Sequence, residues 1–162
     1  MNGSPLLISI AEALAECRLE AVLIGNAAAA LHGAPVTTLD FDFMFRQAPA
    51  NLTKLKKFAR QLNATIFRPY YPASALWRVV NDDRGLQVDF MSAVHGVRSF
   101  AGLRARAQQI NISSFTLLIA DLSDIITSKR AADRQRDRAV LEILELTLRE
   151  KEKLKSGEPP SA

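Results

Sequence analysis

Two aspartates, Asp40 and Asp42, have the spacing of a pair that binds a divalent metal ion. They alternate with apolar residues over 39–45, which predicts a β-strand with an aromatic face and an acidic face. Residues i and i+2 of a strand share one face and lie about 6.5–7 Å apart. Because Mg²⁺ and Mn²⁺ take carboxylate, water and phosphate oxygens as ligands, the pair predicts a metal site that also accepts a phosphate-bearing ligand.

A third aspartate, Asp89, follows the same alternation in a second predicted strand, where it lies on the face opposite Val88 and Phe90. If this strand neighbours the strand of Asp42 in a sheet, three acids share one surface while aromatic side chains fill the core beneath. Aspartate is depleted in strands, and like charges repel unless cations offset them. Asp89 alone would favour a solvated strand residue, and the Asp40–Asp42 pair alone is equally compatible with either interpretation, so it is the combination that favours a metal site.

Two further features are of the kind that binds phosphate. Gly25 and Asn26 follow the apolar residues 21–24; glycine lets the backbone approach a ligand, and the N–H groups of a following helix attract anions. Lys129 shares a predicted helical stripe with Leu122, where a charged group either extends to solvent or meets an anion. A Gly-Asn turn alone is not diagnostic, and an extended lysine is the alternative for Lys129.

The hydrophobic periodicity predicts a chain of the α/β (α+β) class that positions these residues. Ser9 begins a capping-box pattern, Asp121 is the expected N-cap of a late helix, and the turn-rich residues 81–85 predict an antiparallel hairpin. The expected helices cover 9–18, 27–31, 50–62, 100–107, a segment from 122 and 134–155, and the expected strands cover 21–24, 39–45, 77–80, 86–90, 108–112 and 115–119.

Length and composition match one globular domain. The chain has 162 residues, of which 48% are hydrophobic and 23% charged. The single cysteine, Cys17, excludes an intramolecular disulfide and a cysteine zinc cage and favours a reducing compartment. Acidic and basic residues interrupt the apolar residues 5–35, which argues against a membrane span or a secretory signal. We therefore expect a cytoplasmic protein with no membrane partner.

Positive charge is concentrated in the middle of the sequence. The net charge is +4, and residues 51–110 carry ten Lys and Arg against three Asp, whereas residues 1–50 carry two against five acids. A basic surface attracts phosphate-bearing ligands or nucleic acids. A solvated face with scattered arginines is the alternative interpretation, because +4 is a modest excess.

The combination of residues 23–26, a thirteen-residue spacer and residues 40–43 resembles the signature of the DNA polymerase β-like nucleotidyltransferase superfamily. The His-Gly and Thr-Thr pairs inside the spacer, together with residues 124–137, are similar to the small bacterial members. Those members include minimal nucleotidyltransferases and AbiEii-type toxins of toxin–antitoxin systems. The similarity covers about residues 8–148.

The resemblance implies a fold and an activity. The fold would be a mixed, twisted sheet flanked by helices in one domain over residues 1–155, with a helical part at about 121–155 and a flexible tail at 156–162. The activity would be transfer of a nucleoside monophosphate from an NTP such as ATP to a hydroxyl of an RNA, a protein or a small molecule, with Mg²⁺ or Mn²⁺ and release of pyrophosphate. A cognate antitoxin or operon partner is a further implied partner.

The resemblance also assigns roles to residues of the chain. The catalytic and metal-binding residues would be Asp40, Asp42 and Asp89. The nucleotide-binding residues would be Gly25, Asn26, Thr38, Lys129, Arg134 and Asp137.

Two departures from the family pattern leave an alternative open. Asn26 replaces the usual Gly or Ser, and Val36 stands where related proteins often have an arginine. Neither departure touches the three acids, which favours an active enzyme. The alternative is a catalytically degenerate protein of the same fold that acts as an antitoxin or interaction module. A basic nucleic-acid binder is a third possibility, although no recognised DNA or RNA motif is present.

Overall fold

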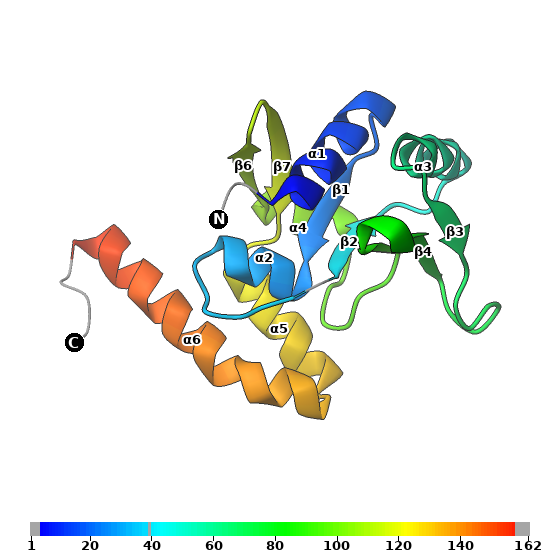
Figure 1. Ribbon diagram of the computed structural model, residues 1–162. Helices are drawn as coiled ribbons and strands as arrows, with labels where there is room; N and C mark the ends of the chain where they lie inside the picture. The colour runs from blue at the N-terminus through cyan, green and yellow to red at the C-terminus, as the bar shows by residue number, and fades with distance from the viewer. Residues whose placement is uncertain (1–3, 39, 158–162) are drawn as a thin grey trace.

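The computed structural model describes residues 4–38 and 40–157, which form a seven-stranded mixed sheet in the order β3-β4-β5-β2-β1-β7-β6 (Figure 1). β2 pairs in parallel with β5, β1 pairs in parallel with β7, and the other neighbours are antiparallel. The mixed sheet and the predicted hairpin are confirmed. The strands are β1 Ala21–Ile24, β2 Phe41–Phe45, β3 Thr65–Phe67, β4 Leu76–Asn81, β5 Leu86–Met91, β6 Gln108–Ile112 and β7 Phe115–Ile119.

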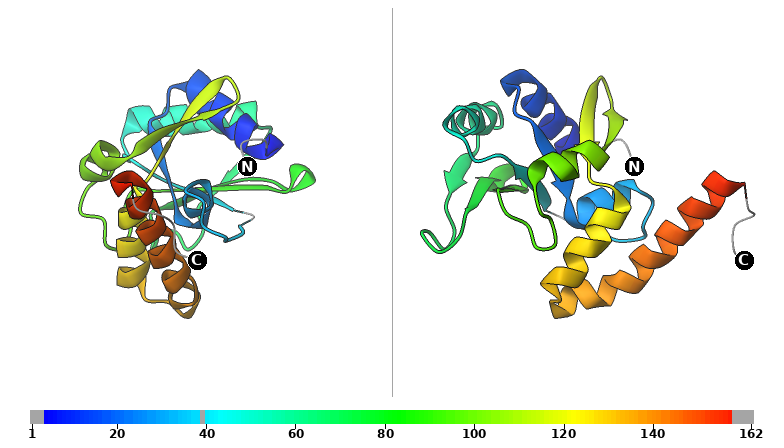
Figure 2. Two further views of the ribbon diagram at one scale, coloured as in Figure 1. Left: turned by 90° about the vertical axis from the view of Figure 1, so that its left-hand side faces the viewer. Right: turned by 180° about the vertical axis from the view of Figure 1, so that it is seen from behind.

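Six α-helices flank the sheet in the described part of the chain. α1 and α3 lie side by side in each view, whereas α2 and α5 contact each other away from them (Figures 1 and 2). The helices are α1 Pro5–Cys17, α2 Gly25–Leu31, α3 Pro49–Gln61, α4 Phe100–Arg106, α5 Leu122–Ala132 and α6 Gln135–Ser156.

Alternation in β2 and β5 separates an aromatic core from an acidic face. Phe43 stacks on Phe90 with ring centroids 5.4 Å apart, and Phe58 of α3 meets the edge of Phe90 at 5.1 Å. All three rings are completely buried between the sheet and α3. Asp42 and Asp89 are on the other face, because successive side chains of a strand point to opposite sides.

The same alternation determines on which side of the sheet the basic residues of α3 lie. α3 covers the aromatic face, so its cations lie on the side of the sheet away from the aspartates. The basic helix therefore does not supply cations to the acidic face, and a phosphate-binding role there must come from other residues. The α3 cations are Lys54, Lys56, Lys57 and Arg60.

Several element boundaries differ from those predicted from the sequence; in particular, β2 begins at Phe41, so Asp40 precedes the strand that was predicted to contain it. α1 begins at Pro5, so Ser9 lies inside the helix and the predicted capping box is wrong; proline at the first helical position, with its φ already set for a helix, starts the helix earlier. The short strand β3 was not predicted, and the hairpin connection contains a 3₁₀ turn, Asp82–Arg84. The Asp121 carboxylate does accept a hydrogen bond from Ser123 N, as an N-cap should.

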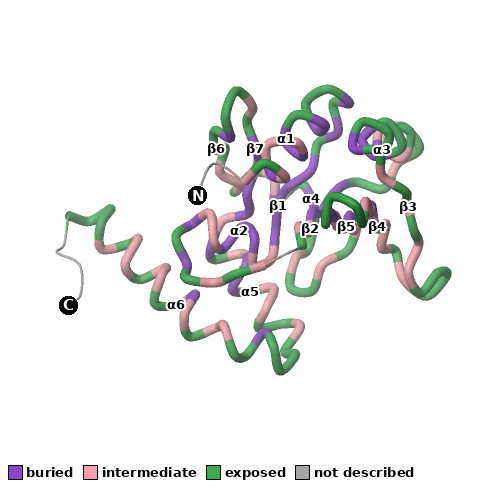
Figure 3. Tube along the Cα trace, in the orientation of Figure 1, coloured by how far each residue is buried: buried purple, intermediate pink, exposed green. Residues whose placement is uncertain are grey.

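The C-terminal helix α6 leads away from the rest of the molecule (Figures 1 and 2). Figure 3 shows that burial is concentrated in the central strands and in α1, while α6, described over its whole length, is a mixture of exposed and intermediate residues in which only Asp137 and Leu144 are buried. α6 includes Ser156 and is capped by Gly157, so the predicted tail does not begin at 156; its remaining residues, 158–162, lie outside the described part of the chain. None of the described helices is long and apolar enough to cross a membrane.

Candidate active site

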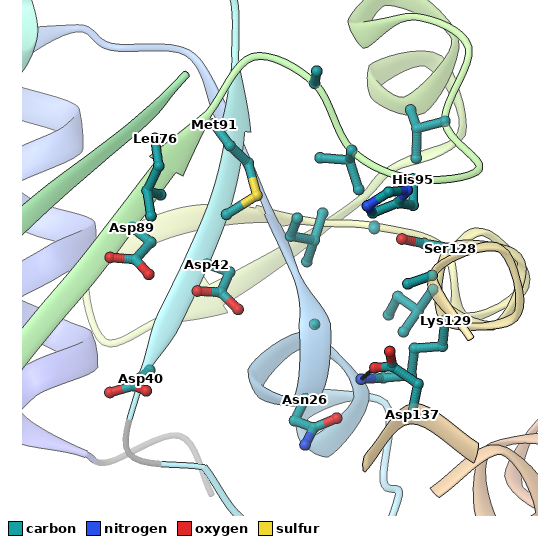
Figure 4. Close-up of a pocket in the computed structure, with 18 of the residues that line it drawn as sticks. Asn26, Asp40, Asp42, Leu76, Asp89, Met91, His95, Ser128, Lys129 and Asp137 are labelled. Atoms are coloured by element: carbon teal, nitrogen blue, oxygen red, sulfur yellow. Dashed lines mark ion pairs between the residues drawn. The ribbon is translucent and has the colours of Figure 1, made fainter. Parts of the chain in front are cut away.

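A pocket of about 690 Å³ lies on the acidic face of the sheet (Figure 4). Its walls come from the β1–α2 junction, β2, the β4–β5 hairpin, the loop after β5, α5 and the start of α6. All nine residues that the sequence pattern singled out line it, although they are spread over more than one hundred positions of the chain. These residues are Gly25, Asn26, Thr38, Asp40, Asp42, Asp89, Lys129, Arg134 and Asp137.

The two strand aspartates lie directly beside each other. Asp42 and Asp89 are register partners on the parallel strands β2 and β5, so the structure meets the condition under which the acids share one surface. Asp40 precedes β2, and its backbone is held by Thr38. The Thr38 hydroxyl donates a hydrogen bond to Asp40 O at 2.9 Å and accepts one from Asp40 N at 3.2 Å. Thr38 therefore fixes the backbone of the first aspartate.

The environment of Asp42 disfavours its charged form. Burial raises the pKa of Asp42 to about 6, and the charges of Asp89 and Asp40 act in the same direction. Lys129 and Arg134 oppose this rise from the other side of the pocket. Asp42 is thus an incompletely compensated carboxylate that a cation would stabilise.

Gly25 lets the β1–α2 junction approach Asp42 closely. Its φ of +69° is in the left-handed region, and a Cβ placed there would lie 3.2 Å from Asp42 Oδ2. The neighbouring Asn26 has a buried Oδ1 atom with no hydrogen-bond partner among the described residues. The turn therefore combines close backbone packing with an unsatisfied acceptor at the pocket wall.

Asp89 already has a cationic partner. Arg78 of β4 donates from Nε to Asp89 Oδ1 at 2.9 Å and from Nη2 to Oδ2 at 3.1 Å. This hydrogen bonding raises the pKa of Arg78. This pairing of Arg78 with Asp89 was not predicted from the sequence. The register of the hairpin, which places Arg78 opposite Asp89, is the signal that would have found it.

At the α5–α6 junction the buried Asp137 holds two cations against the pocket, the largely buried Lys129 and the half-exposed Arg134. Asp137 is only 1% exposed; its Oδ2 accepts from Arg134 Nε at 2.6 Å, and its Oδ1 lies 3.6 Å from Lys129 Nζ. Burial alone would raise the pKa of Asp137, but the hydrogen bonds and charges of Arg134 and Lys129 lower it overall. Burial also lowers the pKa of Lys129. We interpret Asp137 as the group that positions both cations, since its own oxygens are already engaged.

The donor set fits a divalent cation through two of the three aspartates. Asp40 and Asp42 offer hard oxygens, and one or two carboxylates with substrate phosphates are a usual Mg²⁺ ligand set. The pKa of Asp42 is raised by burial and by the charges of Asp89 and Asp40, and a bound cation would stabilise the carboxylate against both effects. Asp89 is held by Arg78, and in residues 4–38 and 40–157 no three acidic, His or Cys side chains are arranged to hold a metal. The metal-binding role of Asp89 therefore stays a prediction.

The two histidines have different positions. His32 is buried between helices, with Nε2 donating to Ala120 O at 2.7 Å and Nδ1 accepting from Lys151 Nζ at 2.7 Å, which agrees with a structural role. His95 lines the pocket in the loop after β5. Its neighbour Gly96 packs so closely on α5 that a Cβ would lie 2.9 Å from Thr127 O.

The sheet order and flanking helices define a nucleotidyltransferase-like fold. The structure is similar to that of the antibiotic-resistance factor ANT(2″)-Ia, an aminoglycoside nucleotidyltransferase, with a TM-score of 0.60 and 13% sequence identity over 88% of this chain and 80% of that chain. At this identity the likeness extends to the fold alone. No protein-family model and no curated protein sequence matches the chain.

Proposed function

We propose that the protein is a metal-dependent nucleotidyltransferase that transfers a nucleoside monophosphate from an NTP to an acceptor hydroxyl. The observation that carries the proposal is a single pocket with carboxylates at its centre and with Lys129 and Arg134, the cations paired with Asp137, along one wall (Figure 4). The nucleotidyltransferase-like fold supports it. The likeness to toxin-like family members noted in the sequence further suggests work within a toxin–antitoxin or defence system, with a cognate partner protein.

The chain supplies groups for each part of the reaction. Asp40 and Asp42 would hold Mg²⁺ or Mn²⁺, which screens the triphosphate charge and activates the α-phosphorus. Lys129 and Arg134 would bind the β- and γ-phosphates and stabilise the leaving pyrophosphate. The acceptor oxygen bonds to the α-phosphorus as the bond to the bridging oxygen breaks. Asp89, on the acceptor side, would take the hydroxyl proton.

Label transfer tests this proposal. The protein is incubated with each α-labelled NTP, Mg²⁺ or Mn²⁺, and a cell extract, and the label is followed into RNA, protein and small molecules. We expect transfer with at least one NTP and a loss of at least about 10³-fold in Asp42→Asn, because electrostatic stabilisation of the reacting phosphate is removed. Arg84→Ala, on the hairpin but outside the pocket, is the matched control. Tight binding of a partner protein without transfer from any NTP would instead favour the interaction module.

A further inference from the structure

The described chain exposes its large aromatic side chains in one place. Phe67 is 52% exposed, Tyr70 80% and Tyr71 66%, and all three lie at the end of β3 or in the β3–β4 loop, residues 68–75. The remaining large exposed apolar residues are two leucines of α6. Exposed aromatic side chains that cluster on a protein surface commonly mark a binding site.

Internal contacts give the β3–β4 loop a defined conformation. The Arg68 guanidinium lies 3.6 Å from the centroid of the Trp77 ring and 4.7 Å from that of Tyr71. Arg68 Nε also donates to Leu76 O at 3.3 Å. The loop is therefore packed around one arginine, and this packing accounts for Tyr71 but leaves the ring of Tyr70 without a role.

Tyr70 is held in a conformation that an aromatic residue rarely adopts. Its φ is +61°, in the left-handed region, and its carbonyl accepts from Ala73 N at 2.7 Å and from Ser74 N at 3.2 Å. Although its ring is largely exposed, Tyr70 also lines the pocket that contains the aspartates. A strained aromatic residue kept at the mouth of a pocket points to a ligand contact.

The sheet order identifies which end of the pocket Tyr70 occupies. β4 and β5 lie on one side of β2, whereas α5, which follows β7, supplies Lys129 on the other side. Figure 4 accordingly shows Asp42 between Leu76 and Asp89 on one side and Lys129 and Asp137 on the other. If Lys129 and Arg134 bind the leaving pyrophosphate, in-line displacement brings the acceptor from the opposite end, which is that of Tyr70.

The side chains at this end favour a planar ligand over a polycation. Asp89 is neutralised by Arg78, so beyond the Asp40–Asp42 pair no uncompensated carboxylate of the described pocket lining awaits an amine-rich acceptor. An exposed tyrosine offers a flat face, and two cations lie at this end, Arg78 in the pocket lining and Arg68 in the loop of Tyr70. A nucleobase on a phosphate backbone satisfies both features, because every base has a π-face for stacking.

We propose that Tyr70 is a stacking platform for a nucleobase at the acceptor end of the pocket. The assignment of the acceptor end rests on the proposed function, whereas stacking itself does not need catalysis. The base could belong to a single-stranded nucleic-acid acceptor or to the NTP, and the two sources share the same chemistry at Tyr70. The in-line geometry favours the acceptor.

Equilibrium binding to Tyr70 variants tests the proposal. Tyr70→Asn removes the ring but tolerates positive φ, whereas Tyr70→Phe retains the ring. The probes are a short single-stranded oligoribonucleotide, Mg²⁺-ATP and Mg²⁺-tripolyphosphate, which has no base. We expect Tyr70→Asn to weaken oligoribonucleotide binding about tenfold and Tyr70→Phe to leave it within about twofold. Fluorescence of Trp77, the one tryptophan, reports whether the loop packing survives.

The outcomes separate this proposal from the proposed function. Selective loss of oligoribonucleotide binding supports stacking of an acceptor base, and selective loss of ATP binding with tripolyphosphate unchanged supports stacking of the NTP base. The proposal is overturned if Tyr70→Asn weakens binding of all three probes equally, or if it weakens binding of neither the oligoribonucleotide nor ATP. It is also overturned if the wild-type protein binds neither of these two base-bearing probes. Failure of tripolyphosphate alone to bind counts against the proposed function and leaves stacking to be judged by the oligoribonucleotide.

Discussion

Single residues around Asp42 control whether its carboxylate can receive a cation. Gly25 is a sensitive position because Asp42 Oδ2 lies 3.2 Å from where a Cβ would be. We expect Gly25→Ala to lower the free energy of unfolding by about 1–2 kcal/mol, from positive φ, and also to displace Asp42 and weaken Mn²⁺ binding. Gly33→Ala is the matched control, since Gly33 also has positive φ but no atom within 4 Å of its Cβ position.

Thermal denaturation and Mn²⁺ titration of both glycine variants distinguish strain from displacement. The control should lose stability but keep its Mn²⁺ affinity. Equal Mn²⁺ affinities of the two variants would show that close packing of Gly25 on Asp42 is irrelevant to the ion.

If a metal ion binds at the strand aspartates, Arg78 would compete with it for Asp89. Removing Arg78 frees a buried carboxylate next to Asp42 and eliminates one positive charge, so Arg78→Ala should raise the Mn²⁺ affinity of the protein on the order of tenfold while lowering its stability. Electron paramagnetic resonance of free Mn²⁺ measures the affinity, with Arg84→Ala as the hairpin control. Weaker Mn²⁺ binding in Arg78→Ala would mean that Arg78 instead orients Asp89 for the ion.

At the scale of elements, α6 packs along α5 and reaches back to α2. Arg130 of α5 forms an ion pair with Glu145 of α6, and Leu144 of α6 is completely buried. Asp137 ties its first turn to Lys129 of α5, and Lys151 donates to His32, the residue that caps α2. These contacts hold the start of α6 against the pocket, although Asp137 and Leu144 are the only buried ones among the described residues of this helix. The position of Arg134 therefore depends on how the helix is anchored.

The His32 contact makes stability depend on pH. Burial lowers the pKa of His32 from 6.5, the neighbouring cations Lys151 and Lys155 act in the same direction, and Ala120 O and Asp121 oppose them. Below pH 6.5 the unfolded state then binds more protons than the folded state, so stability falls as pH falls through this window.

Urea denaturation of wild type and His32→Gln between pH 5 and 8 measures this linkage. The stability of wild type relative to the variant should rise with pH to about 6.5 and then level off, by about 1.4 kcal/mol per unit of pKa difference. Asp42 titrates in an overlapping range with the opposite sign, but it is present in both proteins and cancels in the comparison. A difference that is flat with pH would refute the buried neutral histidine.

At the scale of the whole molecule, local patterns were predictable and long-range pairings were not. Alternation over residues 39–45 is a local signal, so it correctly placed Asp42 opposite the phenylalanines. The Arg78–Asp89 pair depends on hairpin register, which composition does not encode. β3 has only three residues, too few for the alternation of a strand to be recognised in the sequence. Because this strand was not predicted, neither was the exposed loop that follows it and carries Tyr70.

The residues of the candidate site were predictable because they lie in short local sequence patterns. The resemblance rested on short segments whose residues also line one pocket in the structure. What it could not supply is the state of each side chain: Asp89 is paired, Asp137 is buried between two cations, and only Asp40 and Asp42 are left for an ion.

Binding of a metal–triphosphate complex at Asp42 is the central claim, and calorimetric titration tests it most directly. Wild type and Asp42→Asn are titrated with Mn²⁺ and an α,β-methylene NTP analogue that cannot transfer its nucleotide. We expect a saturable heat for wild type that requires both components, and none for Asp42→Asn although that variant is folded. Equal binding by the two proteins, or no binding by wild type with any of the four bases, would contradict the claim.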